Sequence, residues 1–394
     1  MLIGLVGKPS VGKSTFFKAC TLANVAIASY PFTTISPNRG MAYVKIDCID
    51  SEFNVQCMPR TGYCVNHKRF VPVELMDVAG LVEGASEGKG LGNQFLDDLR
   101  QADCFIQIVD VSGTTDAGGK EGHGDPIADV KMLERELDLW YMGILNKVWK
   151  TFARALQQRK EDFAKSIAKQ FSGLKVSEDD VKRVVLKLKY NTENPANWTE
   201  EQLLGFAHAL RHLTKPMIIA ANKIDKPQAK ENLELLRKTF PDYLIAPCSC
   251  DSELALRQAA KAGMIEYIPG DKDFKIKKEL NPKQVQALEE IRKNVLLEYS
   301  DGTGVQQIMN KSVFELLKYI AIFPAGAHKL ADSKGNILPD CFLLPEGSTA
   351  LDFAFSLHTD IGNNFVKAID ARTGKALGKD HVLKNRDALE IAVR

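Results

Sequence analysis

GKPSVGKS, residues 7–14, has the pattern G-x-x-x-x-G-K-S of a phosphate-binding loop. The apolar run before it, residues 2–6, is short enough for a buried strand, and residues 15–20 can begin a helix. In this context the glycines let backbone N–H groups turn toward phosphate oxygens, Lys13 reaches the β- and γ-phosphates, and Ser14 holds Mg²⁺. We therefore expect a nucleotide site formed by Gly7, Lys8, Pro9, Ser10, Val11, Gly12, Lys13, Ser14 and Thr15.

A second motif, NKID at residues 222–225, indicates which base is bound. It follows an apolar run at 216–221 that predicts a buried strand. The Asp225 carboxylate can accept hydrogen bonds from the N1–H and exocyclic amine that guanine has and adenine lacks. We expect Lys223 to pack on the base and Asn222 to tie this loop to the phosphate-binding loop. A later strand-like run leads to two residues that fit a backbone contact to guanine O6, Ser249 and Cys250.

A third motif, D-x-x-G at residues 77–80, ends another strand-like run. Asp77 would hold Mg²⁺ through water, and the Gly80 N–H would sense the γ-phosphate. Thr33 and Thr34 lie between the first and third motifs, where a Mg²⁺-binding threonine belongs. From placement alone, either threonine can be that ligand.

The segments that flank these motifs resemble the Obg family of GTPases, and more closely its YchF-like branch of archaeal type. The resemblance rests on YPFTTISPN at 30–38 and GLVEGASEGKGLGNQFL at 80–96. It implies that Thr34 is the metal-binding threonine. The implied catalytic residues are then Lys13, Thr34 and Gly80, and the implied Mg²⁺ ligands are Ser14, Thr34 and Asp77.

Two departures from related GTPases bear on the reaction. Leu81 stands where many GTPases have a water-orienting glutamine, so we expect slow intrinsic hydrolysis. Glu83, Glu87, a backbone group or a partner's residue would then position the water. YchF proteins proper resemble ATP users with a degenerate guanine motif, whereas the intact NKID here favours GTP; a YchF-type ATPase remains an alternative.

Composition limits the other possibilities. The chain has 394 residues and a formal net charge of +2, which argues against a basic nucleic-acid binder as a whole, and we expect no DNA partner. The eight cysteines form no paired C-x-x-C zinc pattern, so we expect free thiols in a reducing cytosol. With neither a signal peptide nor a membrane-length apolar run, a cytoplasmic protein without membrane contact is expected.

A helical insertion is expected at about 128–198, between two strands of the sheet. Apolar residues at three- and four-residue steps from 133 to 171 predict one long amphipathic helix, and a second helix begins near Ser177. Residues 141–190 hold twelve basic and five acidic side chains, a net charge of +7. This surface is either a solvated helical hairpin or a contact to the phosphate backbone of RNA, as on a ribosome.

The C-terminal part has helical patterning at 276–317 and short strands with one helix at 318–394. GSTALDFA at 347–354, followed by Leu357-His358, resembles the TGS domain, a ubiquitin-like β-grasp module. That resemblance implies contact with RNA or the ribosome.

These observations predict an α/β protein: a P-loop GTPase with a doubly wound, mostly parallel sheet, an inserted helical arm and a C-terminal β-grasp (α+β) domain. The predicted divisions are a G domain at 1–275, a helical linker at 276–317 and a TGS domain at 318–394. The predicted function is Mg²⁺-dependent hydrolysis of GTP to GDP on or near the ribosome or RNA. The alternative is a nucleotide-gated ribosome- or RNA-binding module whose hydrolysis is incidental.

Overall fold

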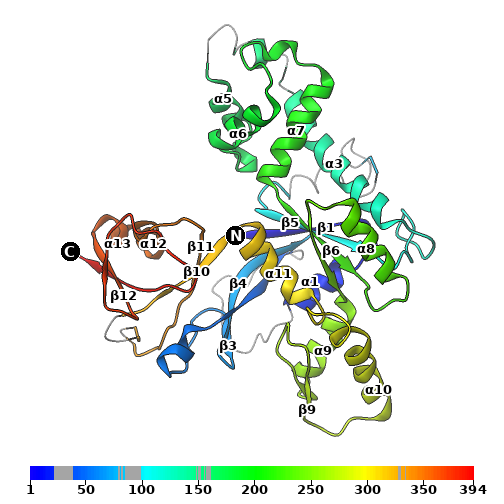
Figure 1. Ribbon diagram of the computed structural model, residues 1–394, viewed down its shortest axis with the longest axis vertical. Helices are drawn as coiled ribbons and strands as arrows, with labels where there is room; N and C mark the ends of the chain where they lie inside the picture. The colour runs from blue at the N-terminus through cyan, green and yellow to red at the C-terminus, as the bar shows by residue number, and fades with distance from the viewer. Residues whose placement is uncertain are drawn as a thin grey trace.

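The computed structural model describes residues 1–21, 39–78, 80, 83–84, 99–147, 149, 152–154, 156, 161–326, 330–332 and 334–394. Its centre is a seven-stranded sheet with the order β2-β4-β1-β5-β6-β7, and β3 also pairs with β4 (Figure 1). The strands are β1 (Leu2–Val6), β2 (Arg39–Asp47), β3 (Tyr63–Val65), β4 (Lys68–Asp77), β5 (Cys104–Asp110), β6 (Met217–Asn222) and β7 (Leu244–Cys248).

The strands β4, β1, β5, β6 and β7 run parallel, while β2 and β3 pair antiparallel with β4. Parallel strands bring their carboxyl ends to one edge of the sheet, where ligands of open α/β sheets bind. The register aligns Asp77 beside Leu5, and it aligns Asn222 between Asp110 and Cys248. Motifs far apart in the sequence therefore meet at this edge.

Helices cover both faces of the sheet. One face packs against α1 (Lys13–Thr21), α9 (Cys250–Lys261) and α11 (Val305–Asn310), and the other against α3 (Pro126–Asn146), α7 (Glu200–Thr214) and α8 (Ala229–Thr239). Alternation along β6 explains this: Ile218 and Ala220 join the first core, while Ile219 and Ala221 join the second. The predicted doubly wound α/β fold is confirmed.

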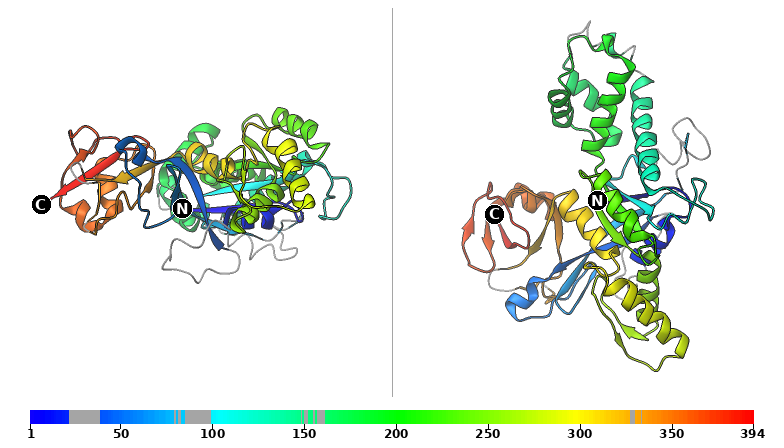
Figure 2. Two further views of the ribbon diagram at one scale, coloured as in Figure 1. Left: turned by 90° about the horizontal axis from the view of Figure 1, so that it is seen from below. Right: turned by 45° about the vertical axis from the view of Figure 1, so that its right-hand side comes forward.

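An arm of helices projects from the sheet and contains α5 (Phe163–Gln170), α6 (Glu178–Leu188) and the outer parts of α3 and α7 (Figures 1 and 2). Packed aromatic rings, among them Trp149, Phe163, Trp198 and Phe206, form its core. Helix α6 begins directly after Ser177, as the sequence predicts, and Ser177 forms a capping box with Asp180.

The single long helix predicted from 133 to 171 is wrong. Helix α3 ends at Asn146, and a separate helix, α5, begins at Phe163. The side chain of Asp162 accepts a hydrogen bond from the Lys165 N–H and starts the new helix. Both helices bury apolar residues in the same core, so the apolar periodicity continues across the break.

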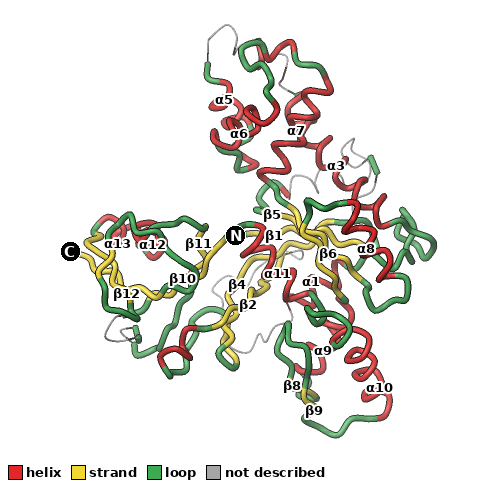
Figure 3. Tube along the Cα trace, in the orientation of Figure 1, coloured by secondary structure: helices red, strands yellow, loops and turns green. Residues whose placement is uncertain are grey.

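The C-terminal module has a five-stranded mixed sheet with the order β11-β10-β14-β12-β13, drawn in yellow in Figure 3. Helix α12 (Ala350–Leu357) packs on this sheet and begins with a capping box at Thr349. A short helix, α13 (Thr359–Asn363), follows it. The strands are β10 (Tyr319–Pro324), β11 (Phe342–Pro345), β12 (Phe365–Asp370), β13 (Ala376–Leu377) and β14 (Ala388–Val393). The predicted β-grasp domain is confirmed.

Helices also connect the two sheets. Helix α10 (Pro282–Ile291) lies beside the two short strands β8 (Ile265–Glu266) and β9 (Lys275–Ile276). Helix α11 shares the core that contains Ile3 and Phe16 of the central sheet and α1. The exact domain boundaries at 275 and 317 stay predictions. No helix in the described part of the chain is long and apolar enough to cross a membrane.

Candidate nucleotide-binding site

The loop between β1 and α1 has the tight backbone of a phosphate-binding loop. Gly7 and Gly12 adopt φ values of 147° and 104°, in the region that favours glycine. A Cβ at Gly7 would lie 2.5 Å from the Ile108 carbonyl oxygen, and one at Gly12 would lie 2.3 Å from the Asn222 side chain. Both glycines are therefore required by close approach as well as by backbone angle.

The side chain of Lys13, in the first turn of α1, folds over this loop. Its Nζ donates hydrogen bonds to the carbonyl oxygens of Gly7 (3.0 Å) and Lys8 (2.7 Å). Burial lowers the pKa of Lys13 to about 8, and the charge of Asp77 opposes that shift. The ammonium group is thus held above the loop and close to the expected metal ligands.

Ser14 and Asp77 lie together although 63 residues separate them. The Ser14 Oγ donates to Asp77 Oδ2 at 2.8 Å, while Asp77 Oδ1 is buried and has no hydrogen-bond partner among the described residues. Burial raises the pKa of Asp77. A hydroxyl beside a carboxylate with an unused buried oxygen suits Mg²⁺, which prefers oxygen ligands. The residues present fit this metal.

Asn222, at the end of β6, connects three elements. Its Nδ2 donates to the Val11 carbonyl oxygen at 2.7 Å, and its Oδ1 accepts from the Cys250 N–H at 3.0 Å. The first bond is the tie to the phosphate-binding loop that the sequence predicts, and the second attaches α9.

Lys223 and Asp225 project from the loop after β6. The Lys223 backbone has a φ of 68°, and its Nζ lies 2.7 Å from the buried Asp110 Oδ2. The Asp225 carboxylate is 28% exposed, and its Oδ1 accepts from the Ser249 Oγ at 2.9 Å. Asp225 is therefore oriented by a buried hydroxyl and still accessible to a base.

The backbone contacts of Ser249 and Cys250 to guanine O6 stay predictions, and in this structure both N–H groups donate to protein partners. The Ser249 N–H already donates to the Thr303 carbonyl oxygen at 2.9 Å, and the Cys250 N–H donates to Asn222. Both residues are buried at the start of α9. Their place in the structure is to position Asp225 and Asn222, a role that the linear motif does not reveal.

The side chain of Lys8 turns away from the loop surface, and the predicted backbone contact of Lys8 to phosphate stays a prediction. Lys8 is 2% exposed, with its Nζ 2.7 Å from Asp129 Oδ2 of α3 and 2.8 Å from the Thr115 carbonyl oxygen. Burial raises the pKa of Asp129. Only the backbone of Lys8 remains to meet a phosphate, while its side chain fixes the phosphate-binding loop to α3.

Sequence reasoning missed Asp110, at the end of β5. Its buried carboxylate accepts from Ser112, Thr115 and Lys223. Burial opposes ionisation, but these hydrogen bonds hold the pKa of Asp110 below its ordinary value. Asp110 orients both Lys223 and the loop that follows β5. Its position at the carboxyl end of a strand, ahead of a Gly-rich segment, is the sequence feature that could have identified it.

The Gly-rich loop at 113–124 closes one side of the site. A Cβ at Gly119 would lie 2.7 Å from the Pro9 side chain, so this loop touches the phosphate-binding loop. Beside it is a cavity of about 1190 Å³, whose lining includes Ser10, Lys223 and Asp251. The cavity thus runs from the phosphate-binding loop to the base-reading residues.

Gly80 approaches the site from the end of β4. A Cβ there would lie 2.8 Å from the Pro9 nitrogen, which places Gly80 against the phosphate-binding loop. Glu83, one of the residues expected to position water, is exposed to solvent. The neighbouring Gly84 N–H donates to Glu136 of α3 at 2.7 Å. The other predicted residues of this region, Thr33, Thr34, Leu81 and Glu87, lie outside the described residues.

Comparison with protein-family profiles agrees with this arrangement. The profile "50S ribosome-binding GTPase" matches residues 2–147, and "Obg-like GTPase YGR210-like, G4 motif-containing domain" matches 220–326. The profile "TGS domain" matches residues 330–393. The three matches cover the central sheet and the C-terminal module.

Relatives extend over nearly the whole chain. An uncharacterized GTP-binding protein of Methanocaldococcus jannaschii is 47% identical over 392 residues, covering 99% of this chain and 98% of the relative. One of Schizosaccharomyces pombe is 37% identical, covering 89% and 88%. The ribosome-binding ATPase YchF of Bacillus subtilis is 28% identical, covering 93% and 87%.

A solved structure has the same fold. The GTP-binding protein of Pyrococcus horikoshii OT3 superimposes with a TM-score of 0.80 at 38% identity, and the match covers all of both chains. The YchF GTPase of Schizosaccharomyces pombe, at 21% identity and a TM-score of 0.60, shares the fold. The chain belongs to the YchF/Obg-like GTPase family and combines a P-loop G domain with a C-terminal TGS domain.

Proposed function

We propose that this chain binds GTP in preference to ATP and hydrolyses it slowly to GDP with Mg²⁺, on or near the ribosome. The observation that carries the proposal is the hydrogen bond from Ser249 to Asp225. Beside it, Asn222 joins the Cys250 N–H, next to Ser249, to the phosphate-binding loop. Asp225 presents a carboxylate at the place where a base would lie when phosphates occupy the loop. A carboxylate there accepts hydrogen bonds from the N1–H and exocyclic amine of guanine, and adenine has no equivalent donors at these positions.

Ser14 and Asp77 would hold Mg²⁺, with Thr34 as the further ligand that the family resemblance implies. When bound, the ion neutralises charge on the β- and γ-phosphates. The Ser14–Asp77 pair supports this assignment because it leaves the Asp77 Oδ1 buried and available for a cation.

The remaining chemistry belongs to Lys13 and backbone N–H groups. Lys13 sits on two loop carbonyl oxygens and can exchange them for phosphate oxygens with little movement, which stabilises charge that develops during hydrolysis. Gly80 lies against Pro9, and its N–H would meet the γ-phosphate. Since Leu81 offers no polar group to orient water, hydrolysis without a partner is slow.

The arm supports contact with ribosomal RNA. Lys165 and Lys169 of α5 are exposed, and neither forms an ion pair with a described residue. Leu186 of α6, 75% exposed, lies between Arg183 and Lys187, which are also exposed. Lys175 is different, because it pairs with Asp103 and attaches the arm to the central sheet. An exposed basic surface of this kind binds phosphate backbones without reading sequence.

The alternative of an ATPase is favoured by one observation, the ATPase names of relatives that are 26% to 39% identical over the matched residues. Substituting Asp225 separates the two. The Asp225→Asn variant keeps an acceptor for Ser249 but offers an amide donor to the base. It should therefore lose affinity for guanine nucleotides and gain affinity for xanthine nucleotides, because xanthine has a carbonyl in place of the amine.

We expect Asp225→Asn to weaken GTP binding about 10²- to 10⁴-fold and to strengthen XTP binding. Competition against a fluorescent nucleotide measures both constants. The matched control is Asp242→Asn, an exposed carboxylate in the loop before β7. Unchanged GTP affinity in Asp225→Asn would refute the proposed base recognition, and the gain of XTP binding shows that the variant is folded.

A further inference from the structure

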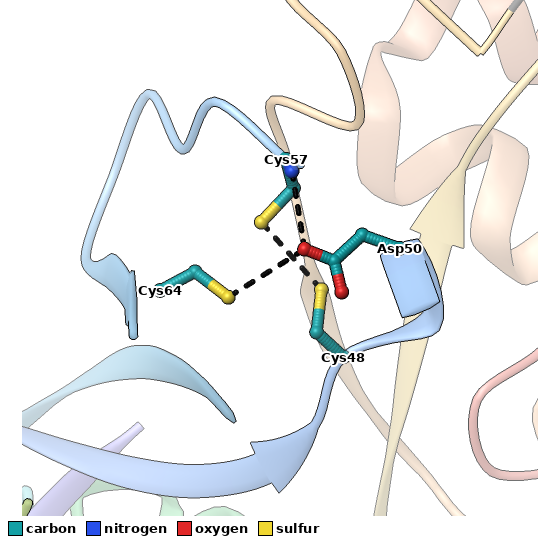
Figure 4. A group of neighbouring side chains, drawn as sticks. All are labelled: Cys48, Asp50, Cys57 and Cys64. Carbon is teal, nitrogen blue, oxygen red and sulfur yellow. Dashed lines mark hydrogen bonds between the residues drawn. The ribbon is translucent and has the colours of Figure 1, made fainter. Parts of the chain in front are cut away.

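Three cysteines and an aspartate converge at the end of the sheet opposite the nucleotide site. Cys48 follows β2, Asp50 lies in a 3₁₀ helix (Ile49–Phe53), Cys57 lies in the next loop and Cys64 lies in β3. Figure 4 shows their four side chains pointing toward a common centre. One ligand atom from each lies within 4.8 Å of all the others. The spacing C-x8-C-x6-C has no paired C-x-x-C, which is why the sequence predicts only free thiols.

The distances suit a tetrahedral metal site. Thiolate ligands lie about 2.3 Å from zinc, so two sulfurs of one tetrahedron are about 3.8 Å apart. The Cys48 and Cys57 sulfurs are 3.6 Å apart, and the Cys64 sulfur lies 3.8 Å from Asp50 Oδ2. A disulfide needs sulfurs about 2.05 Å apart, so the Cys48–Cys57 separation does not correspond to one.

Asp50 distinguishes this cluster from an apolar pocket of thiols. Its side chain is completely buried, which is costly for a carboxylate unless charge or hydrogen bonds compensate. Oδ1 lies 2.9 Å from His67 Nδ1, and Oδ2 accepts from the Cys57 N–H at 3.1 Å. Ligands of metal sites are oriented by outer hydrogen bonds of this type.

The cluster lies beside the contact between the central sheet and the C-terminal module. In the loop that holds Cys57, the Met58 and Arg60 N–H groups donate to the carbonyl oxygens of Ile337 (2.8 Å) and Pro339 (2.9 Å). The buried Arg69 guanidinium donates to the carbonyl oxygens of Leu338 and Pro339. Residues 54–62 contain no helix or strand, so few backbone bonds of their own hold them in place.

We propose that Cys48, Cys57, Cys64 and Asp50 bind one zinc ion as a structural site. Four protein ligands close the coordination sphere, as in structural rather than catalytic zinc sites. Binding releases the thiol protons, and the ion holds the 54–62 loop in the position where it meets residues 337–339. The metal is thus independent of the Mg²⁺ at the nucleotide site.

The test is the zinc content of protein purified without chelator, measured by inductively coupled plasma mass spectrometry. We expect about one zinc per chain in the wild type and in Cys341→Ser, and little in Cys57→Ser or Cys64→Ser. Cys341→Ser is the matched control, because Cys341 and Cys64 are both partly buried free cysteines and Cys341 lies outside the cluster.

A second measurement uses only the wild type and does not depend on whether variants fold. Adding a mercurial that blocks thiols should release the zinc stoichiometrically to a colorimetric chelator, and cobalt exchanged into the site should show the visible bands of a tetrahedral thiolate complex. The proposal is overturned if the wild-type protein contains no zinc and also takes up no cobalt. A Cys48–Cys57 disulfide found by mass spectrometry would overturn it as well. Unchanged zinc affinity in Asp50→Asn would contradict the assignment of the fourth ligand.

Discussion

The two ends of strand β4 support two different kinds of site. At the carboxyl end, Asp77 meets the phosphate-binding loop, and the residues around it lie in contiguous sequence motifs. At the amino end, about 30 Å away along a ten-residue strand, Arg69 and the nearby His67 flank the cysteine cluster. On the proposed function the first site binds, hydrolyses and releases a nucleotide, whereas the proposed zinc site would be closed by its four protein ligands.

The two sites make different demands on the fold. The nucleotide site keeps a partly exposed carboxylate at Asp225 and an unused carboxylate oxygen at Asp77, and both are available to exchangeable ligands. The cysteine cluster has Cys48 and Asp50 fully buried and only Cys64 partly exposed, so most of its ligand atoms are shielded from solvent. Changes at the first site should therefore alter turnover, and changes at the second should alter stability.

The largest effect on turnover is expected at Lys13. Lys13→Ala removes the ammonium group that rests on the carbonyl oxygens of Gly7 and Lys8, and we expect GTP hydrolysis to fall about 10²- to 10³-fold. Lys18→Ala, on the exposed side of the same helix, is the control and should keep wild-type turnover. Single-turnover kinetics measure the rate, and an unchanged melting temperature shows that the fold is intact. Wild-type turnover in Lys13→Ala would be incompatible with its assigned role.

A smaller effect is expected from the arm. Reversing Lys165 and Lys169 to Glu should weaken ribosome binding and reduce the slope of log affinity against log salt by about 2, because two phosphate contacts are lost. GTP affinity should not change, since α5 lies far from the phosphate-binding loop in Figures 1 and 2.

The matched control for the arm reverses Lys283 and Lys293, two exposed lysines at α10 and just after it. It makes the same change in net charge elsewhere on the molecule. Co-sedimentation with ribosomes at several salt concentrations gives the slopes. Equal slopes for wild type, arm variant and control would show that the arm is a solvated surface.

The smallest effect is a pH dependence at the base of the arm. A hydrogen bond to Asp138 raises the pKa of His208 above its ordinary value, with the two side chains 2.7 Å apart. A raised folded-state pKa gives stability that is complete below the unfolded pKa of about 6.5 and is lost as pH rises through the folded pKa. His208 is half exposed, so this contribution is at most about 1 kcal/mol.

We therefore expect His208→Gln to lower the melting temperature by about 1 °C near pH 5.5 and by less near pH 9. His123→Gln, in the exposed Gly-rich loop, should show no such difference. Thermal unfolding followed by circular dichroism at both pH values measures this. An equal loss at both pH values would mean that His208 stabilises by packing alone.

The sequence predicts the fold and the outline of the nucleotide site because each motif is short and contiguous. The register of parallel strands then brings Asp77 and Asn222 to one edge without further information. The roles of Lys8, Ser249 and Cys250 were not predictable, since each depends on a partner more than 20 residues away. Spacing within a motif does not determine which backbone groups are already bonded.

The cysteine cluster was not predictable for a related reason. Cys48 and Cys64 meet because β2 and β3 both pair with β4, with Asp47 and Val65 each opposite Lys68. That register is a property of the sheet and is not visible as a spacing in the chain. The break between α3 and α5 shows the same limit, because one aspartate, Asp162, starts a helix without disturbing the apolar pattern.

We propose that Asp225 makes this site select guanine, and the most direct test is the ratio of GTP and ATP dissociation constants for the wild type. Both are measured with Mg²⁺ by competition against one fluorescent nucleotide. The structure predicts that GTP binds at least about 10²-fold tighter than ATP. The reason is that a site whose carboxylate accepts hydrogen bonds from the edge of guanine rejects a base that lacks those donors. Equal constants, or tighter binding of ATP, would contradict the account.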